Sequence, residues 1–387
     1  MSLIACRRGK CSRSPRAESE ASLHMASTYA FIGLGIIGGS IAKALRKYEP
    51  DCRIMAYMRT RSRLELARSE GVVDTVLGSV GKELGAADII FLCAPVEYNR
   101  DYLALIKPFL AEGTILTDVG STKAEILKCA GELGLGPHFI GGHPMAGSEK
   151  TGYENSDPLI LENAYYMLCP SEEAPEALVS RMTGLVSAIR AIPFRIEAEL
   201  HDRTVATISH LPHLIAAALV NLVEDTDSPD GVMRRAAAGG FKDITRIASG
   251  SPVMWEQICR TNREAIISVL DRYMDSLKDI RAALKTADVS AVHDLFEKSG
   301  AYRKTIDDDR TGFIDAKHSF SVYVADRPGS ISILAAILAA GGISIRNIGI
   351  NHSREAYEGA LRVSFYDGDS RELAEKLLKN YGYMIGR

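Results

Sequence analysis

The order of apolar and polar positions along the chain divides it into three successive patterns. In the first, residues 29–196, short apolar runs alternate with segments whose apolar residues recur at helical spacing. The run at 88–93 is apolar throughout except at its ends, as in a strand buried within a parallel sheet. Strands that alternate with helices predict a doubly wound α/β sheet with right-handed crossovers. We expect its strands at 29–32, 53–57, 88–93, 114–117, 139–140, 165–168 and 193–196.

The second pattern, residues 197–310, has helical periodicity and no convincing strand. Helices are expected at 208–223, 255–284 and 289–304. The middle one carries an apolar stripe at Tyr273, Met274, Leu277, Ile280 and Leu284. We therefore predict an all-helical domain that buries this stripe in its own core or against a second subunit, which makes the chain a homodimer.

The third pattern, residues 316–387, returns to strands. Phe320, Val322 and Val324 alternate with polar neighbours, and a turn at 326–329 leads into a helix that Gly341 ends. Strands at 343–351 and 360–366 and a helix at 371–381 follow. This order predicts a small ferredoxin-like α+β domain.

Composition narrows the class of protein. The 46 Lys and Arg against 49 Asp and Glu leave a net charge of −3, which gives no reason to expect a nucleic-acid partner. The longest apolar stretches, about ten residues and broken by charge, predict no membrane span. Seven scattered cysteines without a CxxC pair indicate reduced thiols in a cytoplasmic protein rather than a zinc or disulfide framework. Residues 1–28, rich in Arg and Ser, lack a secretory apolar core and are interpreted as a disordered extension.

A glycine-rich turn directly follows the first expected strand. Gly33, Gly35 and Gly38 form the GxGxxG pattern between a strand and a helix, the context required of a Rossmann-type dinucleotide site. The backbone around Ile36 and Ile37 then opens a helix whose N-terminus favours phosphate. We therefore expect NAD or NADP to bind here.

The choice between the two cofactors stays open. The residue expected to bind the ribose 2′-hydroxyl is Met58, followed by Arg59, Thr60 and Arg61, so no carboxylate is present to favour NAD. The two arginines can bind a 2′-phosphate, or they can simply be a solvated turn.

Two further segments concentrate side chains suited to catalysis and binding. His143 lies among glycines and a proline, so we expect it on a loop beyond a late strand, where an imidazole can accept a proton near neutral pH. His210 and His213 have HxxH spacing, but a third ligand is missing, so we predict no metal. Near Gly239, Lys242 and Arg246 are suited to carboxylates, with arginine offering a bidentate fork.

These residues together resemble the prephenate/arogenate dehydrogenase family of tyrosine biosynthesis over roughly residues 28–306. The matching blocks are FIGLGIIGGS (31–40), TDVGSTK (117–123), GGHPMAGSE (141–149), LHD (200–202), SHLPH (209–213) and GGFKDITRIA (239–248). The C-terminal segment, with its DRPGSI turn (326–331), resembles an ACT domain, an amino-acid-binding module.

The resemblance implies oxidative decarboxylation of prephenate to 4-hydroxyphenylpyruvate, or of arogenate to tyrosine, with hydride transfer to NAD(P). It implies that His143 accepts the proton of the ring hydroxyl and that Ser121 hydrogen-bonds the same oxygen. It also implies that Arg246 binds the ring carboxylate. Other residues implied at the substrate are Ser209, His213, Gly239 and Trp255, with Glu149, His201 and Asp243 in a polar network at the pocket mouth. In the ACT-like segment, Asp326, Gly329 and Asn347 would frame L-tyrosine as an effector.

Two other functions explain only part of this pattern. Another hydroxy-acid dehydrogenase would explain the glycine turn but not the GGHP and GGFKDITR blocks together. A nicotinamide sensor without catalytic activity would not need Ser121, His143 and Arg246. The sequence does not decide between prephenate and arogenate, nor whether tyrosine acts at the C-terminal segment or competes at the active site.

Overall fold

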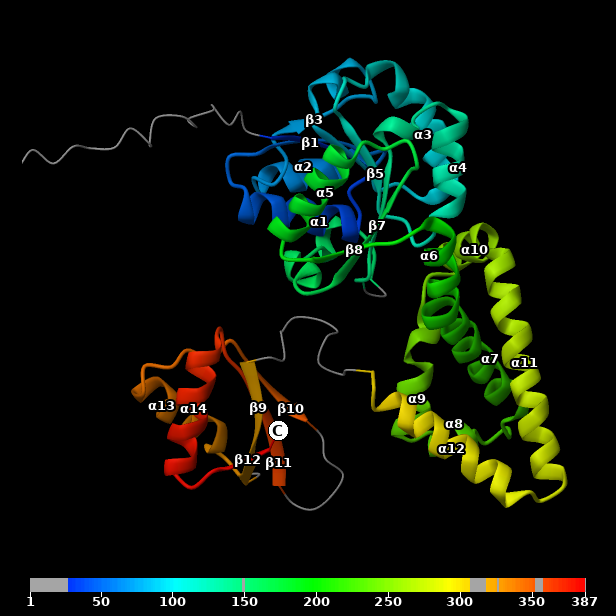
Figure 1. The fold of residues 1–387 in the computed structure, drawn as a ribbon, viewed down its shortest axis with the longest axis vertical. Coiled ribbons are helices and arrows are strands. Elements are labelled where there is room, and N and C mark those ends of the chain that lie inside the picture. The colour runs from blue at the N-terminus through cyan, green and yellow to red at the C-terminus, as the bar shows by residue number, and fades with distance from the viewer. Residues whose placement is uncertain (1–26, 148–149, 307–317, 326, 352–357, 387) are drawn as a thin grey trace, which may run out of the picture.

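The structure, a computed structural model, describes residues 27–147, 150–306, 318–325, 327–351 and 358–386. Figure 1 shows three parts in chain order, a sheet domain, an elongated group of helices and a small sheet with two helices. Residues 1–26 of the extension expected at 1–28, and the site residues Glu149 and Asp326, lie outside the described residues. The expected boundary is slightly too late, because Thr28 already belongs to the first strand.

The first part is built on a parallel sheet of five strands in the order β3-β2-β1-β4-β5. Its strands are β1 (Thr28–Ile32), β2 (Arg53–Tyr57), β3 (Thr75–Val76), β4 (Ile89–Leu92) and β5 (Ile115–Asp118). Helices α1 (Ile36–Tyr48), α2 (Arg61–Ser69), α3 (Asn99–Ile106) and α4 (Ala124–Glu132) connect them. β1 lies between β2 and β4 and pairs with both in parallel, with Ile32 opposite Tyr57 and Leu92. The carboxyl ends of these three strands therefore lie together at one edge of the sheet. The predicted Rossmann-type sheet is confirmed.

Alternating residues of β1 supply the two cores of this domain. Tyr29 and Phe31 belong to one apolar cluster with Ile41 and Leu45 of α1. Ala30 and Ile32 point the other way, into a cluster that contains residues of α3 and α4. Because successive side chains of a strand face opposite sides, a strand covered by helices on both faces must be apolar at every position.

The three later strands lie where strands were expected, but they form a sheet of their own. They are β6 (Ile140–Pro144), β7 (Tyr165–Pro170) and β8 (Ile192–Arg195), and helix α5 (Glu176–Ala188) packs on them. β7 runs antiparallel to β6, and the connection between them contains two short 3-10 helices, Tyr153–Asn155 and Pro158–Leu161, instead of an α-helical crossover. A single parallel bridge, Leu116 to Phe139, joins this sheet to β5.

The helical part begins where expected, but its first helix starts ten residues earlier than the helix predicted at 208–223, and the part is divided into more helices. It contains α6 (Ala198–Val205), a π-helical turn (Ala206–His210), α7 (Leu211–Thr226), α8 (Val232–Ala236), α9 (Gly239–Thr245), α10 (Pro252–Thr261), α11 (Arg263–Lys285) and α12 (Val289–Arg303). The helix expected at 255–284 is in fact two helices, because Asn262 leaves the helical conformation with φ −120° and ψ 27°. Three members of the predicted stripe remain exposed in the single chain, namely Met274, Leu277 and Leu284.

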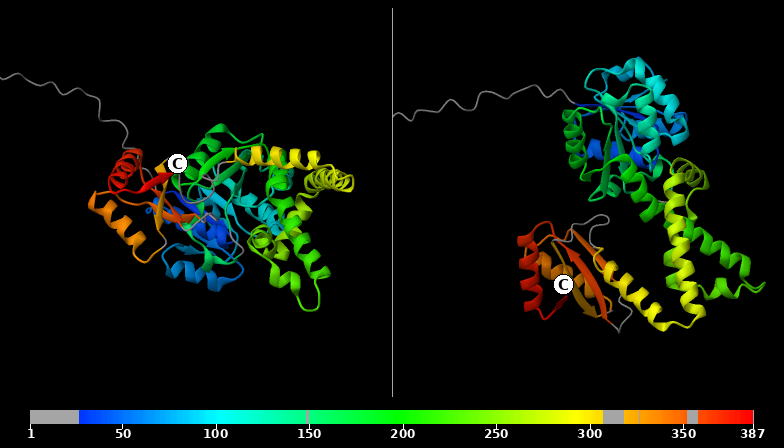
Figure 2. Two further views of the ribbon diagram at one scale, coloured as in Figure 1. Left: turned by 90° about the horizontal axis from the view of Figure 1, so that it is seen from below. Right: turned by 45° about the vertical axis from the view of Figure 1, so that its right-hand side comes forward.

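The continuous run at 198–226 is long and apolar enough, by length and composition, to cross a membrane. The apolar stretches of the sequence predict no span of this length. The polar side chains of His201 and Asp202 near its start are buried and hydrogen-bonded inside the protein. We interpret the run as part of the helical domain, since α11 and the turn at Arg246–Ser249 pack on it and Trp255 and Ile258 of α10 share its apolar cluster, although only 28% of its apolar window is buried. Figure 2 shows α7 in green beside α11 in yellow.

The C-terminal part has the order β-α-β-β-α-β. It comprises β9 (Ser319–Ala325), α13 (Ser330–Ala340), β10 (Asn347–Asn351), β11 (Glu358–Ser364), α14 (Gly368–Asn380) and β12 (Met384–Gly386). The strands form an antiparallel sheet in the order β10-β11-β9-β12, with both helices on one face (Figure 1). Phe320, Val322 and Val324 point into its core, as expected. The final strand was not predicted, and β10 begins four residues later than expected.

Candidate active site

The glycine turn has the shape that a dinucleotide requires. Gly33 has φ +91°, and a side chain there would lie 2.8 Å from the carbonyl group of Cys93. A Cβ on Gly38 would lie 2.9 Å from the Cβ of Cys93, whereas the space above Gly35 is open. Gly35 caps α1 without a side-chain hydrogen bond, and the first N–H groups of a helix have no partner within it. The turn therefore fits a pyrophosphate at the start of α1.

Arg59 lies at the neighbouring end of β2. Tyr57, the last residue of β2, accepts a hydrogen bond from the N–H of Gly33 at 2.7 Å, so the two strand ends are adjacent. The guanidinium of Arg59 lies 4.4 Å from the ring centre of Tyr98, which follows β4. Arg59 is thus held by an aromatic ring beside the glycine turn, at the edge where the nucleotide is expected.

His143 lies within β6, opposite Met167 of β7, so its expected place on a loop is wrong. The glycines before it serve close packing rather than a turn. A Cβ on Gly142 would lie 2.6 Å from the carbonyl oxygen of Asp118, and one on Gly141 would lie 2.9 Å from Leu127. These glycines let β6 approach β5 and place His143 beside the carboxyl end of the parallel sheet.

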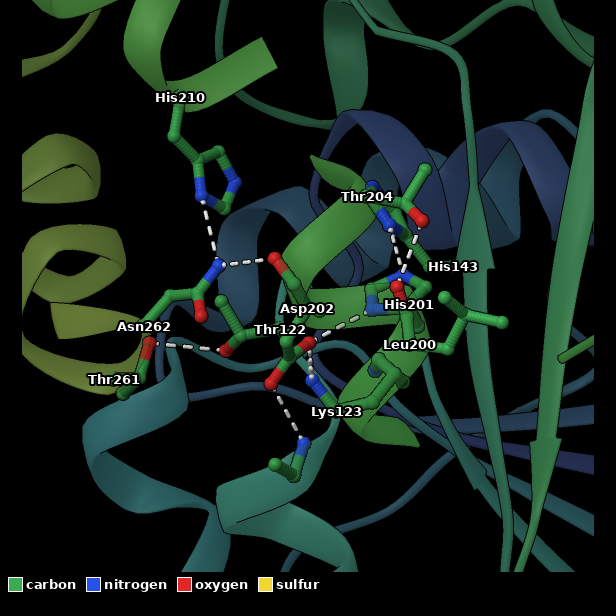
Figure 3. Close-up of polar contacts among 12 residues, drawn as sticks. Thr122, Lys123, His143, Leu200, His201, Asp202, Thr204, His210, Thr261 and Asn262 are labelled. Carbon is green, nitrogen blue, oxygen red and sulfur yellow. Dashed lines mark hydrogen bonds and ion pairs between the residues drawn. The ribbon is translucent and has the colours of Figure 1, made fainter. Parts of the chain in front are cut away.

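Two histidines and a carboxylate form a hydrogen-bonded chain that ends at His143 (Figure 3). Nδ1 of His143 lies 2.8 Å from Nε2 of His201, and Nδ1 of His201 lies 2.8 Å from Oδ1 of Asp202. A carboxylate only accepts, so a neutral His201 donates from Nδ1 and accepts at Nε2. His143 then donates from Nδ1, which leaves its Nε2 with a lone pair. The chain therefore fixes His143 in the tautomer that accepts a proton.

The environment of His143 also keeps it neutral. Burial, together with the nearby His201 and Lys123, holds the pKa of His143 well below its usual range. Burial likewise lowers the pKa of His210 to about 4. A neutral imidazole at physiological pH is ready to take a proton.

Asp202 also joins the helical part to the sheet domain. Its carboxylate accepts the backbone N–H of Lys123 at 2.8 Å and that of Ala124 at 2.9 Å, at the start of α4. Its backbone carbonyl accepts the Nδ2 of Asn262 at 2.8 Å, and the same Nδ2 lies 3.1 Å from Nδ1 of His210. The break between α10 and α11 at Asn262 is therefore part of the network.

A buried ion pair supports the segment that carries Ser121. The ammonium of Lys123 pairs with Asp118, and both side chains are almost wholly buried. Asp118 also accepts the N–H of Gly120 at 2.8 Å and that of Gly142 at 3.2 Å. Ser121, which is half-buried, is thus fixed between these contacts, close in the fold to β6.

A second group of predicted residues gathers on α7 and α10. The ring of His213 lies 4.3 Å from that of Trp255, and its Nδ1 lies 2.8 Å from the carbonyl oxygen of Ser209. His210 stacks edge-on against the same Trp255 at 6.0 Å. His210 therefore connects this group, through Asn262, to the chain that ends at His143.

The glycine-rich block that carries Gly239, Asp243 and Arg246 forms α9 and the following turn, which pack against α7. Arg246 is exposed and begins the turn at Arg246–Ser249. The structure thus places Arg246 next to the helix of His213 rather than within the buried chain.

Some functional residues were not singled out from the sequence. They are Asp118, Lys123, Asp202 and Asn262, all buried and polar. The first three lie inside the TDVGSTK and LHD blocks, which were the available signal. The role of Asn262 could not be predicted, because an asparagine within a helical pattern does not show which buried groups it hydrogen-bonds.

The HxxH pair is engaged by other partners, Asn262 for His210 and the Ser209 carbonyl for His213. Within the described ranges, the side chains close enough to hold a metal together are the exposed His293, Asp294 and Glu297 of α12.

Comparisons with known proteins agree on one family. Residues 41–192 match the family model "Prephenate dehydrogenase, nucleotide-binding domain", and residues 197–298 match "Prephenate dehydrogenase, dimerization domain". The chain is 36% identical to a prephenate dehydrogenase of Bacillus subtilis over 357 residues, 92% of this chain and 96% of that one. It is 33% identical to that of Lactococcus lactis over 352 residues, 90% of this chain and 96% of that one.

Solved structures give the same result for the first two parts of the chain. A prephenate dehydrogenase from A. aeolicus, in complex with hydroxyphenyl propionate and NAD+, matches with a TM-score of 0.69 and 28% identity. The match covers 74% of this chain and 100% of that one. A Synechocystis arogenate dehydrogenase matches with a TM-score of 0.65 and 28% identity, over 72% and 99% of the two chains.

Proposed function

The chain belongs to the prephenate dehydrogenase family, and from this premise we propose how its active site performs the reaction. The protein is a nicotinamide-dependent dehydrogenase that converts prephenate to 4-hydroxyphenylpyruvate by oxidative decarboxylation. The observation that carries the proposed mechanism is the chain from Asp202 through His201 to His143, beside the nucleotide-binding edge of the sheet.

His143 accepts the proton of the ring hydroxyl on its free Nε2 as the carbon–oxygen double bond forms. Bound NAD(P) supplies the acceptor for the hydride that leaves the same carbon. Loss of the ring carboxylate as CO2 then makes the ring aromatic, and the proton on His143 returns to the phenolate oxygen. His201 and Asp202 hold the imidazole in the accepting tautomer and stabilise its charged form.

The remaining site residues have proposed roles in binding. Ser121 hydrogen-bonds the reacting oxygen, and Arg246 pairs with the ring carboxylate. Ser209, His213, Gly239 and Trp255 surround the side chain of the substrate, with Asp243 in the polar network at the mouth of the pocket. His201, which was expected at that mouth, is instead wholly buried behind His143. We also propose that the helical domains of two chains pair in a homodimer. The apolar stripe of α11 is exposed in the single chain and would be buried by a second subunit, and the matching family model describes a dimerization domain. A cytoplasmic location is part of the same proposal.

Adding prephenate and NAD+ or NADP+ to the purified full chain should produce the absorbance of the reduced nicotinamide together with CO2. Arogenate is the matched comparison, because it differs only in an ammonium for the keto group. We expect kcat/KM for prephenate to exceed that for arogenate, since the relatives at 36% and 33% identity are prephenate dehydrogenases. The absence of activity with both substrates and both cofactors would reject the proposed function.

We propose further that the C-terminal part is an ACT domain that binds L-tyrosine. The β-α-β-β-α-β order of this part supports the proposal. The match to the B. subtilis relative covers 357 residues, 92% of this chain, and therefore extends into the C-terminal part. Gly329 has φ +92° and begins α13 with open space above it, so a carboxylate can approach the backbone there. Asn347 is exposed at the start of β10 and is suited to contact the amino group of tyrosine. The third predicted residue, Asp326, lies outside the described residues.

Deleting the chain after Thr311 should leave the dehydrogenase active and remove its inhibition by tyrosine. The effector site is then distinct from the catalytic one, and the coupling between them is expected to be about 1–3 kcal/mol, a 5- to 150-fold effect. The inhibition constant for tyrosine is measured with both chains at the same prephenate concentration. Full inhibition of an active truncated enzyme would instead show that tyrosine competes at the active site.

A further inference from the structure

The segment between β2 and α2 lacks the group that usually favours NAD. In a sheet of this type, a carboxylate after the second strand binds the ribose 2′-hydroxyl, whereas an arginine accommodates a 2′-phosphate. Here β2 ends at Tyr57, and the next residues are Met58, Arg59 and Thr60. The first carboxylate after the strand is Glu65, in the second turn of α2, and it pairs with Arg61 at 3.4 Å.

Arg59 differs from the other arginines of this segment in its contacts. Arg61 and Arg63 form ion pairs with Glu65 and Glu154, at 3.4 and 3.1 Å. Arg59 forms no ion pair within the part of the chain that the structure describes, and its guanidinium lies over the ring of Tyr98. Tyr98 is the main cause that raises the pKa of Arg59, and the exposed Glu97, next to Tyr98 along the chain, makes a smaller electrostatic contribution in the same direction. The ring thus fixes the guanidinium without neutralising it.

The start of α2 adds to this positive environment. The helix begins at Arg61, its cap Thr60 makes no side-chain hydrogen bond, and its first turn holds no acidic residue. A helix N-terminus without a cap or an acid favours an anion. A guanidinium fork matches the oxygens of a phosphate better than a single hydroxyl does.

We propose that Arg59, positioned by Tyr98, selects a cofactor with a 2′-phosphate, so that this enzyme uses NADP in preference to NAD. The inference rests on the nucleotide-binding role within the proposed function, but not on the identity of the substrate. It separates this chain from the A. aeolicus relative, whose structure contains NAD+.

The test compares adenosine 2′,5′-bisphosphate with AMP, which lacks only the 2′-phosphate, by calorimetry on the full chain without substrate. We expect the bisphosphate to bind about 10- to 100-fold more tightly, the usual effect of a hydrogen-bonded charged pair. Arg59→Ala should abolish this difference and leave AMP binding unchanged, which also shows that the variant is folded. Arg59→Lys should retain part of it, because the charge remains but the fork is lost.

Arg68→Ala is the matched control, since Arg68 lies at the other end of α2 and is paired with Glu65 at 3.9 Å. This variant should keep the preference of the natural chain. Equal binding of the two nucleotides by the natural chain would overturn the proposal, as would an undiminished preference in Arg59→Ala. Because prephenate is absent from these measurements, a failure of the substrate assignment would leave their result intact.

Discussion

Replacing His143 by asparagine is expected to lower kcat by roughly 10²–10⁴, the usual contribution of a general base. The asparagine side chain can still accept the hydrogen bond of the substrate, but it cannot hold the proton. The KM for prephenate and the affinity for nucleotide should change much less, since His143 is not the proposed partner of either carboxylate. Steady-state kinetics with the variant measure both quantities. A kcat within about threefold of the natural value would contradict the assignment.

The same residue determines an expected pH profile. Because the pKa of His143 lies below its usual value of 6.5, the imidazole is neutral and active at and above that pH. Activity is lost only as the pH falls through the lowered pKa. The acid limb of kcat/KM should therefore lie below pH 6.5, and it should disappear in His143→Asn.

Replacing Asp202 by asparagine is expected to lower kcat by at least about 10², although Asp202 is not placed against the substrate. An amide N–H facing His201 would make Nδ1 of that ring an acceptor and move its proton to Nε2. His201 would then donate to His143, and His143 would carry its own proton on Nε2. The proton acceptor would be present in the wrong tautomer.

A structural role alone would give a different result for Asp202. The variant also weakens the contacts to the backbone of Lys123 and Ala124, so its thermal stability must be measured alongside its activity. His201→Asn breaks the same chain and leaves those contacts in place. If the hydrogen bonds from Asp202 through His201 to His143 act as one unit, the two substitutions should not add. The variant that combines Asp202→Asn with His201→Asn should then have a kcat no lower than that of the slower single variant. Additive losses, or normal kcat with raised KM, would show that Asp202 only supports the fold.

Sequence periodicity was sufficient for most of the fold because the buried faces repeat regularly. Four of the five strands of the parallel sheet and the two helices of the C-terminal part lie where apolar spacing placed them. The two-residue strand β3 (Thr75–Val76) was not predicted, because it is too short to show a period. Periodicity could not show that β7 runs back along β6, because an apolar strand reads the same in either direction. It could not reveal the break at Asn262 either, since an amide that satisfies two distant buried groups leaves no periodic trace.

The candidate site was predictable in parts for the same physical reason. The glycine turn is a local feature, and its function follows from the strand before it and the helix after it. His143 was identified as a proton acceptor but placed on a loop, because glycine usually marks a turn and here permits close contact between strands. The partners of His143 come from residues 58 and 59 positions further along the chain, and a single sequence does not show which distant side chains meet.

The π-helical turn at Ala206–His210 constrains how this sequence can vary. His201 and His210 are nine residues apart, about two and a half turns of a regular α-helix, so a regular helix would point them in opposite directions. A π turn holds more residues per turn, and both side chains instead reach the network around Asp202 and Asn262. If this segment relaxed into regular helix at unchanged length, one of the two histidines would leave the network. Related enzymes that keep both histidines at this spacing should therefore also keep the π turn.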